Sequence, residues 1–202
     1  MTATPASTGQ GARARGVLHL VAGPSGSGKD SLMEAARAAR PDILFPRRTI
    51  TREADAGGED HIPATRAEFE AAEAAGRFAL SWRAHGLAYG IPLGIEAALS
   101  AGRHVCVNVS RAAIPEARAR FAPIRALIVT APADVLARRL AARGREPEEE
   151  VARRLARAAY AVPDAPELAM IANDSTLEEG AARFLAALAP APTEDAARKE
   201  DA

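Results

Sequence analysis

The stretch G-P-S-G-S-G-K-D-S, residues 23–31, decides the fold of this 202-residue chain. An apolar run over 17–22 precedes it and predicts a buried strand, and from Leu32 onward apolar residues recur at helical spacing. In a strand, glycine-rich loop and helix that follow in this order, backbone N–H groups and the positive end of the helix dipole point toward one place and bind phosphate there. The sequence therefore predicts a phosphate-binding loop made of Gly23, Pro24, Ser25, Gly26, Ser27, Gly28, Lys29, Asp30 and Ser31.

Lys29 is the residue of this loop that indicates catalysis. Arginine supplies almost all the positive charge, and the only other lysine is Lys199. A lysine at this place reaches the β- and γ-phosphates of ATP as a point charge. The usual pattern has a hydroxyl directly after the lysine to hold Mg²⁺, whereas here Asp30 stands there and Ser31 follows. We expect ATP and Mg²⁺ as cofactors, with Asp30 or Ser31 on the metal; the alternative is a glycine-rich turn without a ligand.

Composition limits the other classes of function. The formal net charge is zero, so a surface for nucleic acid is not expected. No apolar stretch before the loop is long enough for a signal peptide or membrane span. The single cysteine, Cys106, lies in an apolar run and is interpreted as a packed thiol rather than a catalytic one. We expect a cytoplasmic protein, a monomer or homodimer, with a small molecule as partner.

The chain reads as one domain over 16–189, between a disordered leader (1–15) and a flexible tail (190–202). Residues 42–92 are interpreted as an insertion that binds an acceptor and carries its own small sheet. An arginine-rich break over 141–150 is interpreted as a lid. Strands are predicted over 17–22, 78–83, 87–91, 104–109, 124–130 and 168–172. Helices are predicted over 31–40, 65–76, 92–101, 111–121, 132–143, 148–160 and 177–188. A capping box, Thr65 to Glu68, opens the second of them. This alternation predicts an α/β fold, a parallel sheet with helices on both faces and ligands at the carboxyl ends of its strands.

Arginines in two places are candidate contacts for anions. Around the Gly-Pro break, Arg143 and Arg154 are favoured to close over a transferring phosphoryl group; the alternative is a solvated helix face paired with the glutamates at 148–150. The segment 43–51 is predicted to be extended, and Arg47, Arg48 and Arg52 lie on it or directly after it, beside the loop 53–61. They predict either a clamp for an acceptor phosphate or exposed edge-strand charges. His61 and His85 lie in or beside glycine turns, which favours contact with a ligand.

Six ordered motifs resemble the guanylate-kinase-like family, and within it the ribose 1,5-bisphosphate phosphokinase branch. The resemblance covers residues 17–188. Besides the phosphate loop, the motifs are T-I-T-R (49–52), G-G-E-D-H (57–61), S-W-x-A-H-G-L-x-Y-G-I-P (81–92), V-N-V-S-R (107–111) and R-G-R-E-P-E-E-E-V-x-R-R-L (143–155).

The resemblance implies a P-loop nucleoside-monophosphate-kinase-like fold and transfer of the ATP γ-phosphoryl group to ribose 1,5-bisphosphate, giving phosphoribosyl diphosphate. It also implies that Lys29 and the loop hold ATP. The groups that would grip the acceptor are Arg48, Arg52, His61, His85 and Tyr89.

Departures from guanylate kinase support a different acceptor. Ser81 and Ile91 stand where that enzyme reads guanine with a glutamate and a serine, and Asn108 stands where an aspartate is usual. A pocket without paired hydrogen-bonding groups does not favour a base edge. The alternatives are a guanylate or other nucleoside monophosphate kinase, a small-metabolite kinase, and a non-catalytic guanylate-kinase-like interaction module.

Overall fold

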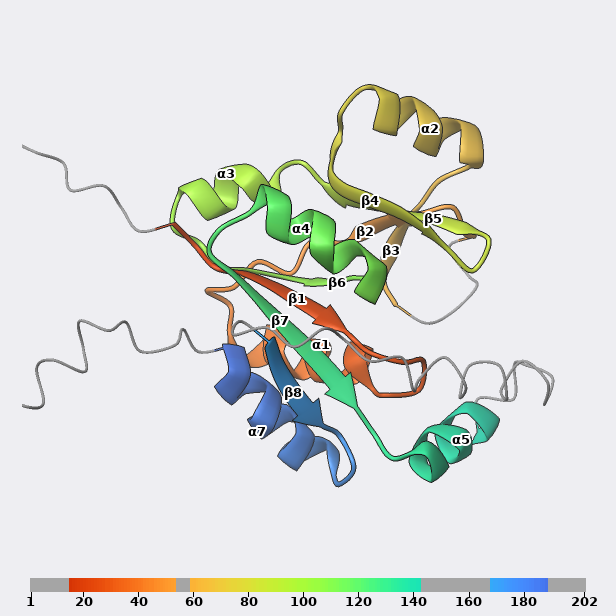
Figure 1. Ribbon diagram of the computed structural model, residues 1–202, viewed down its shortest axis with the longest axis vertical. Coiled ribbons are helices and arrows are strands. Elements are labelled where there is room, and N and C mark those ends of the chain that lie inside the picture. Colours follow the sequence, from red (N-terminus) through yellow and green to blue (C-terminus); the bar gives the residue numbers. More distant parts are fainter. Residues whose placement is uncertain (1–14, 54–58, 143–167, 189–202) are drawn as a thin grey trace, which may run out of the picture.

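The computed structural model describes residues 15–53, 59–142 and 168–188 (Figure 1). Several predicted features lie outside these ranges: Arg143, Arg154, nearly all of the expected lid, the leader, the tail and the helix predicted over 148–160.

A parallel four-stranded sheet forms the main layer, and the predicted α/β fold is confirmed. Its strands are β1 (Leu18–Ala22), β6 (Val105–Asn108), β7 (Ile124–Thr130) and β8 (Leu168–Ala172), in the order β6-β1-β7-β8. Leu18 pairs with Val105 on one side and Ile124 on the other, so β1 lies in the interior of the sheet. Such a strand is buried on both faces, which explains the uninterrupted apolar run before the phosphate loop.

Helices cover both faces of this sheet, as Figure 1 shows. On one face α1 (Lys29–Ala39) and α7 (Leu177–Leu188) pack through a core that includes Leu32, Leu127 and Phe184. On the other face lie α3 (Ile95–Ser100), a short 3-10 turn (Arg111–Ala113) and α4 (Ile114–Arg120), which pack on a second apolar cluster. α5 (Ala133–Ala142) follows β7. Cys106 is fully buried, and burial raises the pKa of its thiol far above the usual range, which fits a packed rather than a reactive cysteine.

A second sheet forms a small subdomain, residues 48–92, above the main sheet in Figure 1. Its strands are β2 (Arg48–Ile50), β3 (His61–Pro63), β4 (Phe78–Ala84) and β5 (Leu87–Pro92), in the order β3-β2-β5-β4. α2 (Arg66–Ala74) covers its outer face and begins with the predicted capping box between Thr65 and Glu68. The prediction that this block carries its own sheet is confirmed.

Several boundaries differ from the sequence-based expectations, and three of these differences lie within residues 42–92. The segment 43–51, predicted to be extended throughout, has regular strand only over β2, and its first residues join the main core, where Leu44 bridges to Val105. The loop predicted to reach residue 61 ends earlier, because β3 begins there. The helix predicted from Pro92 begins at Ile95, because Pro92 still pairs with Phe78 in the β4–β5 hairpin.

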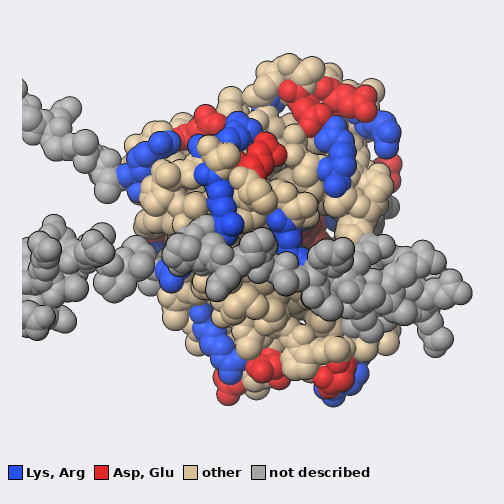
Figure 2. All heavy atoms as spheres, in the orientation of Figure 1, with Lys and Arg blue, Asp and Glu red and all other residues tan. Residues whose placement is uncertain are grey.

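Charge is mixed on the face drawn in Figure 2, where Lys and Arg alternate with Asp and Glu instead of gathering into one patch of single sign. This matches the zero formal net charge. Among the described residues, no helix combines the length and the apolarity that a membrane crossing requires.

His19 makes the stability of the fold pH-dependent. It is fully buried in β1, and burial, opposed in part by the Val105 carbonyl 3.3 Å from Nδ1, lowers its pKa from 6.5 to about 4. Between these values the unfolded chain binds a proton that the folded protein does not, so stability is complete above pH 6.5 and falls as pH falls toward 4. We expect a loss of about 3 kcal/mol in the free energy of unfolding over that range, measured by urea unfolding at pH 7.5, 5.5 and 4.5.

Two variants test the assignment of this loss to His19. His19→Leu should flatten the pH dependence, since the titrating group is gone. His85→Asn removes an exposed imidazole at a turn with φ 54° and should leave the dependence unchanged. An equally steep loss in His19→Leu would contradict the assignment.

Candidate active site

The loop after β1 adopts the geometry of a phosphate cradle. Gly26 and Gly28 have φ of 82° and 85°, which an L side chain adopts only with strain. α1 begins directly afterwards at Lys29. The Lys29 side chain extends back toward the loop, where its ammonium donates to the carbonyls of Gly23 and Pro24, both at 2.9 Å. The helix N-terminus, the loop backbone and the ammonium therefore converge on one small volume that suits phosphate.

Asn173, directly after β8, fastens this loop to the rest of the sheet. It is 5% exposed, and its Nδ2 donates to the carbonyl of Ser27 at 2.7 Å. Its own backbone carbonyl accepts from Arg139 of α5 at 3.0 Å. The sequence analysis misses Asn173, although its position at the carboxyl end of a predicted parallel strand, on the edge where ligands bind, was a usable signal.

Gly28 has no room for a side chain, because a Cβ there would lie 2.3 Å from Asn173 Nδ2. Gly28→Ala should therefore cost more than the ~1–2 kcal/mol that left-handed backbone alone imposes, and should weaken ATP binding. Gly86→Ala is the matched control, since Gly86 has a φ of 76° and open space around its Cβ position. Thermal unfolding and ATP titration of both variants give the comparison. Equal losses of stability in the two variants would show that the contact with Asn173 is unimportant.

Oxygen ligands for a cation lie at the start of α1. Asp30 and Ser31 are both exposed in the first turn, next to Lys29. The side-chain amide of Asn108, at the end of β6, donates to Asp30 Oδ1 at 3.2 Å. Carboxylate and hydroxyl oxygens are the ligands Mg²⁺ prefers, so this donor set fits the metal expected beside ATP phosphates.

The small subdomain meets the phosphate-loop side through Arg48 and Glu59. Arg48 and Glu59 form a two-pronged ion pair, and their side chains are only 11% and 17% exposed. Arg48 Nη1 also donates to the backbone carbonyl of Asn108 at 3.0 Å, and Asn108 Nδ2 lies 3.3 Å from Glu59 Oε2. In the sequence, Glu59 appears only within the motif G-G-E-D-H and its acidic loop. Asn108 appears within V-N-V-S-R and as a departure from guanylate kinase.

Two aromatic rings lie beside Arg48 on the same face of the small sheet. Trp82 and Tyr89 stack with their planes 4° apart and their centroids 5.3 Å apart. The Arg48 guanidinium carbon lies 5.7 Å from the Trp82 ring centroid and 5.1 Å from that of Tyr89. The rings and Glu59 together hold this guanidinium in one place.

Arg52 and His61 form the adjacent part of the site. The placement of His61 in a glycine loop is wrong: it opens β3 and is 5% exposed, with its ring nitrogens 3.0 Å from the Glu59 carbonyl and 3.3 Å from the Arg52 carbonyl. Arg52 Nη2 lies 3.4 Å from His61 Nδ1. Arg47 differs from both Arg48 and Arg52 in its partners, since it donates to the His61 carbonyl and pairs with Asp60. His85 lies in the exposed turn of the β4–β5 hairpin.

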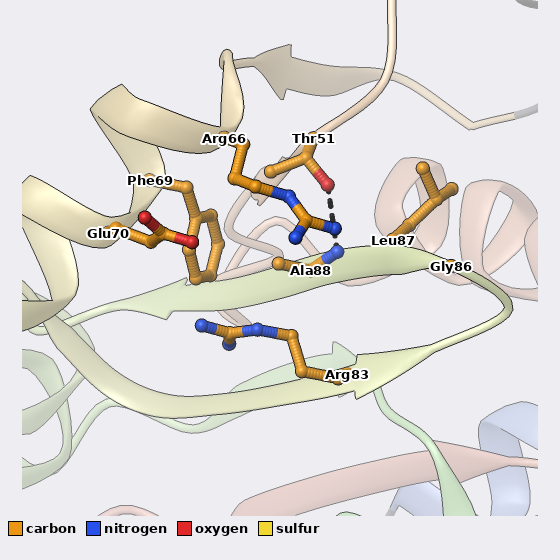
Figure 3. Close-up of a pocket in the computed structure, with 8 residues that line it drawn as sticks. All are labelled: Thr51, Arg66, Phe69, Glu70, Arg83, Gly86, Leu87 and Ala88. Carbon is orange, nitrogen blue, oxygen red and sulfur yellow. Dashed lines mark hydrogen bonds between the residues drawn. The ribbon is translucent and has the colours of Figure 1, made fainter.

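A separate pocket of about 230 Å³ lies on the α2 side of the small sheet (Figure 3). Phe69 and Glu70 of α2 line it from one side, and the hairpin from the other. Arg83 there pairs with Glu73 and lies 4.9 Å from the Phe69 ring centroid. This pocket is on the face opposite Arg48, Trp82 and Tyr89, so it is not part of the candidate active site.

Comparison with known proteins identifies the family. A ribose 1,5-bisphosphate phosphokinase from Chelativorans is 48% identical over 178 residues, which cover 86% of this chain and 85% of the relative. One from Chromobacterium violaceum is 50% identical over 165 residues, covering 81% and 89%. This chain belongs to the ribose 1,5-bisphosphate phosphokinase family. No family model matches the chain.

Three further matches differ more from this chain, one in length and two in sequence. A bifunctional ribose 1,5-bisphosphokinase-thymidine phosphorylase from Cupriavidus necator is 48% identical over 177 residues, but the chain spans only 30% of its length. Among solved structures, guanylate kinase from Anaplasma phagocytophilum superposes with a TM-score of 0.64 at 20% identity, covering 87% of this chain and 86% of that one. A gluconokinase from Sinorhizobium meliloti gives a TM-score of 0.50 at 20% identity, covering 94% and 98%. These two matches support the fold, a P-loop kinase-like parallel sheet.

Proposed function

We propose that this chain transfers the γ-phosphoryl group of ATP to the anomeric phosphate of ribose 1,5-bisphosphate, giving 5-phosphoribosyl 1-diphosphate and ADP. The observation that carries the proposal is the link through Asn108, which connects Asp30 beside the phosphate loop with Arg48 and Glu59 of the small subdomain. Donor and acceptor sites then face each other across one amide side chain. The names of the family relatives supply the identity of the sugar.

The residues suit a phosphate as acceptor. A phosphate oxygen is anionic near neutral pH and attacks without a general base, so catalysis needs positioning and neutralisation of charge. Lys29 and the loop would hold the ATP phosphates, and Arg48 and Arg52 would bind the acceptor beside Tyr89. His61 would contribute by holding Arg52 and Glu59. Asp30 and Ser31 would hold Mg²⁺, which would offset charge on the phosphates.

The proposed kinase has an acceptor-binding insertion and a lid. A kinase domain over 16–189 would use 42–92 to bind the acceptor and 141–150 as a lid. Arg143 and Arg154 would then close over the transferring group, and His85 would meet the substrate at the hairpin. The partner would be a small-molecule phosphorylated sugar. The protein would be a monomer or homodimer, and its use of ATP would place it in the cytoplasm.

The positions that read guanine in guanylate kinase support this choice of acceptor. Ser81 Oγ donates to Glu73 of α2 at 2.6 Å, and Ile91 is fully buried. Neither position therefore presents a free hydrogen-bonding group to a base edge. Because discrimination between substrates depends on such paired groups, GMP should be a poor acceptor.

The direct test is phosphorus NMR of the purified protein with ATP, Mg²⁺ and one candidate acceptor per tube: ribose 1,5-bisphosphate, ribose 5-phosphate, GMP or gluconate. A new diphosphate signal with the sugar bisphosphate alone is the expected result. Faster turnover of GMP would replace the proposal by a nucleoside monophosphate kinase. Silence in every tube, together with no ATP binding, would favour a non-catalytic interaction module.

A further inference from the structure

We propose that Asn108 is a positioning residue that transmits the state of the ATP site to the acceptor side of the molecule. Its side chain is the only bridge of side-chain hydrogen bonds between Asp30 and Glu59 within the described ranges 15–53, 59–142 and 168–188. The proposal rests on the proposed ATP site but not on the identity of the acceptor.

The bridge joins side chains that belong to different parts of the fold. Asp30 belongs to the first turn of α1, and Glu59 precedes β3 of the small subdomain. Asn108 itself ends β6 and pairs with Val21, two residues before the phosphate loop starts at Gly23. The backbone of Asn108 is therefore held in the main sheet, while its side-chain amide contacts Asp30 on one side and Glu59 on the other.

The amide is what makes this bridge possible. Nδ2 can donate two hydrogen bonds, and it lies 3.2 Å from Asp30 Oδ1 and 3.3 Å from Glu59 Oε2. An aspartate of the same shape would offer no donor and would bring a third carboxylate beside the other two. Asparagine here thus turns a site of like-charge repulsion into a link.

On the acceptor side the link ends at Arg48, which would bind the acceptor, and at Trp82, whose fluorescence can be measured. Glu59 pairs with Arg48, and the Asn108 carbonyl accepts from the same guanidinium, which lies 5.7 Å from the Trp82 ring centroid. When phosphates or a cation bind beside Asp30, its hydrogen bond to Asn108 must adjust. Arg48 and Trp82 then experience the change, so ATP should alter the affinity of the acceptor site and the reverse.

Trp82 is the only tryptophan in the chain, so its emission is a specific signal for the acceptor side. The experiment titrates Mg²⁺·ATP into the native protein and into Asn108→Ala and Asn108→Asp, without acceptor. Calorimetry measures ATP binding directly, and fluorescence measures the response of Trp82. We expect Asn108→Ala to bind ATP within about threefold of the native affinity, while the emission change at saturation falls by more than half in both variants.

Four further variants test the link. Glu59→Gln should lose the emission change as well, and Asn108→Ala combined with Glu59→Gln should be no worse than either alone, because both break the same chain of contacts. Glu116→Gln, exposed on α4, is the control for a change of charge alone. Trp82→Phe should abolish the signal.

The outcomes separate this inference from the proposed function. ATP binding without an emission change in the native protein, or a change that survives in Asn108→Ala, would overturn the link and leave the proposed kinase untouched. Absence of ATP binding by the native protein would overturn both.

Discussion

Lys29→Ala is expected to lower kcat/KM by about 1000-fold while the protein stays folded. The ammonium lies over the phosphate loop and donates to the carbonyls of Gly23 and Pro24, so it is in place to neutralise charge on the transferring group. Removing one such preorganised donor costs about 100- to 1000-fold in rate, and here the lost donor also carries a full charge. Steady-state kinetics with ATP and the sugar bisphosphate measure the effect.

Lys199→Ala is the matched control for Lys29, since it removes the only other lysine. Lys29→Arg should also be impaired, because a planar guanidinium cannot replace a compact ammonium in a tight loop. Thermal unfolding shows whether each variant is folded. Normal turnover by folded Lys29→Ala would falsify the assignment of the phosphate loop.

Arg52→Ala is expected to raise the KM for the acceptor about 100-fold with little change in the KM for ATP. Within the described part of the chain, Arg52 Nε is buried without a hydrogen-bond partner, so a guanidinium is held ready at the site. A phosphate would accept two charge-assisted hydrogen bonds from it, each worth about 1.5–3 kcal/mol, and a loss of ~3 kcal/mol corresponds to a factor of about 100. Initial rates at varied acceptor and fixed ATP measure the shift.

Arg66→Ala controls for the loss of one positive charge from the same subdomain. Arg66 lines the pocket on the α2 side together with Thr51, away from Arg48 (Figure 3). We expect its kinetics to match those of the native protein. If Arg52→Ala raises the KM for ATP instead of that for the acceptor, the assignment of the acceptor site is wrong.

Much of the fold could be predicted from local pattern. The last strand and last helix, Leu168–Ala172 and Leu177–Leu188, match the prediction residue for residue, because a short apolar run and a helical apolar period are unambiguous there. The capping box at Thr65 located the start of α2 to the residue. The errors arose where contacts with residues distant in sequence decide the local structure. Pro92 was predicted to begin a helix, but its pairing with Phe78 keeps it in β5.

The candidate site divides in the same way. The prediction of a cradle at Gly26, Gly28 and Lys29 agrees with the backbone that the structure shows. The burial of His61 was missed, because β3 forms only by pairing with β2 and no local pattern marks it. The roles assigned to the site residues stay predictions until the variants above are measured.

The sequence by itself determined the phosphate loop, the parallel sheet and the family, because each depends on contiguous residues: glycines that allow positive φ, apolar runs and ordered motifs. Only the tertiary structure decided how the loop is fastened and linked. Asn173 holds Ser27 across 146 residues, and Asn108 joins Asp30 across 78 and Glu59 across 49. Which amide meets which carboxylate over such separations depends on the order of strands in the sheet, since that order brings the carboxyl ends of distant strands to one edge.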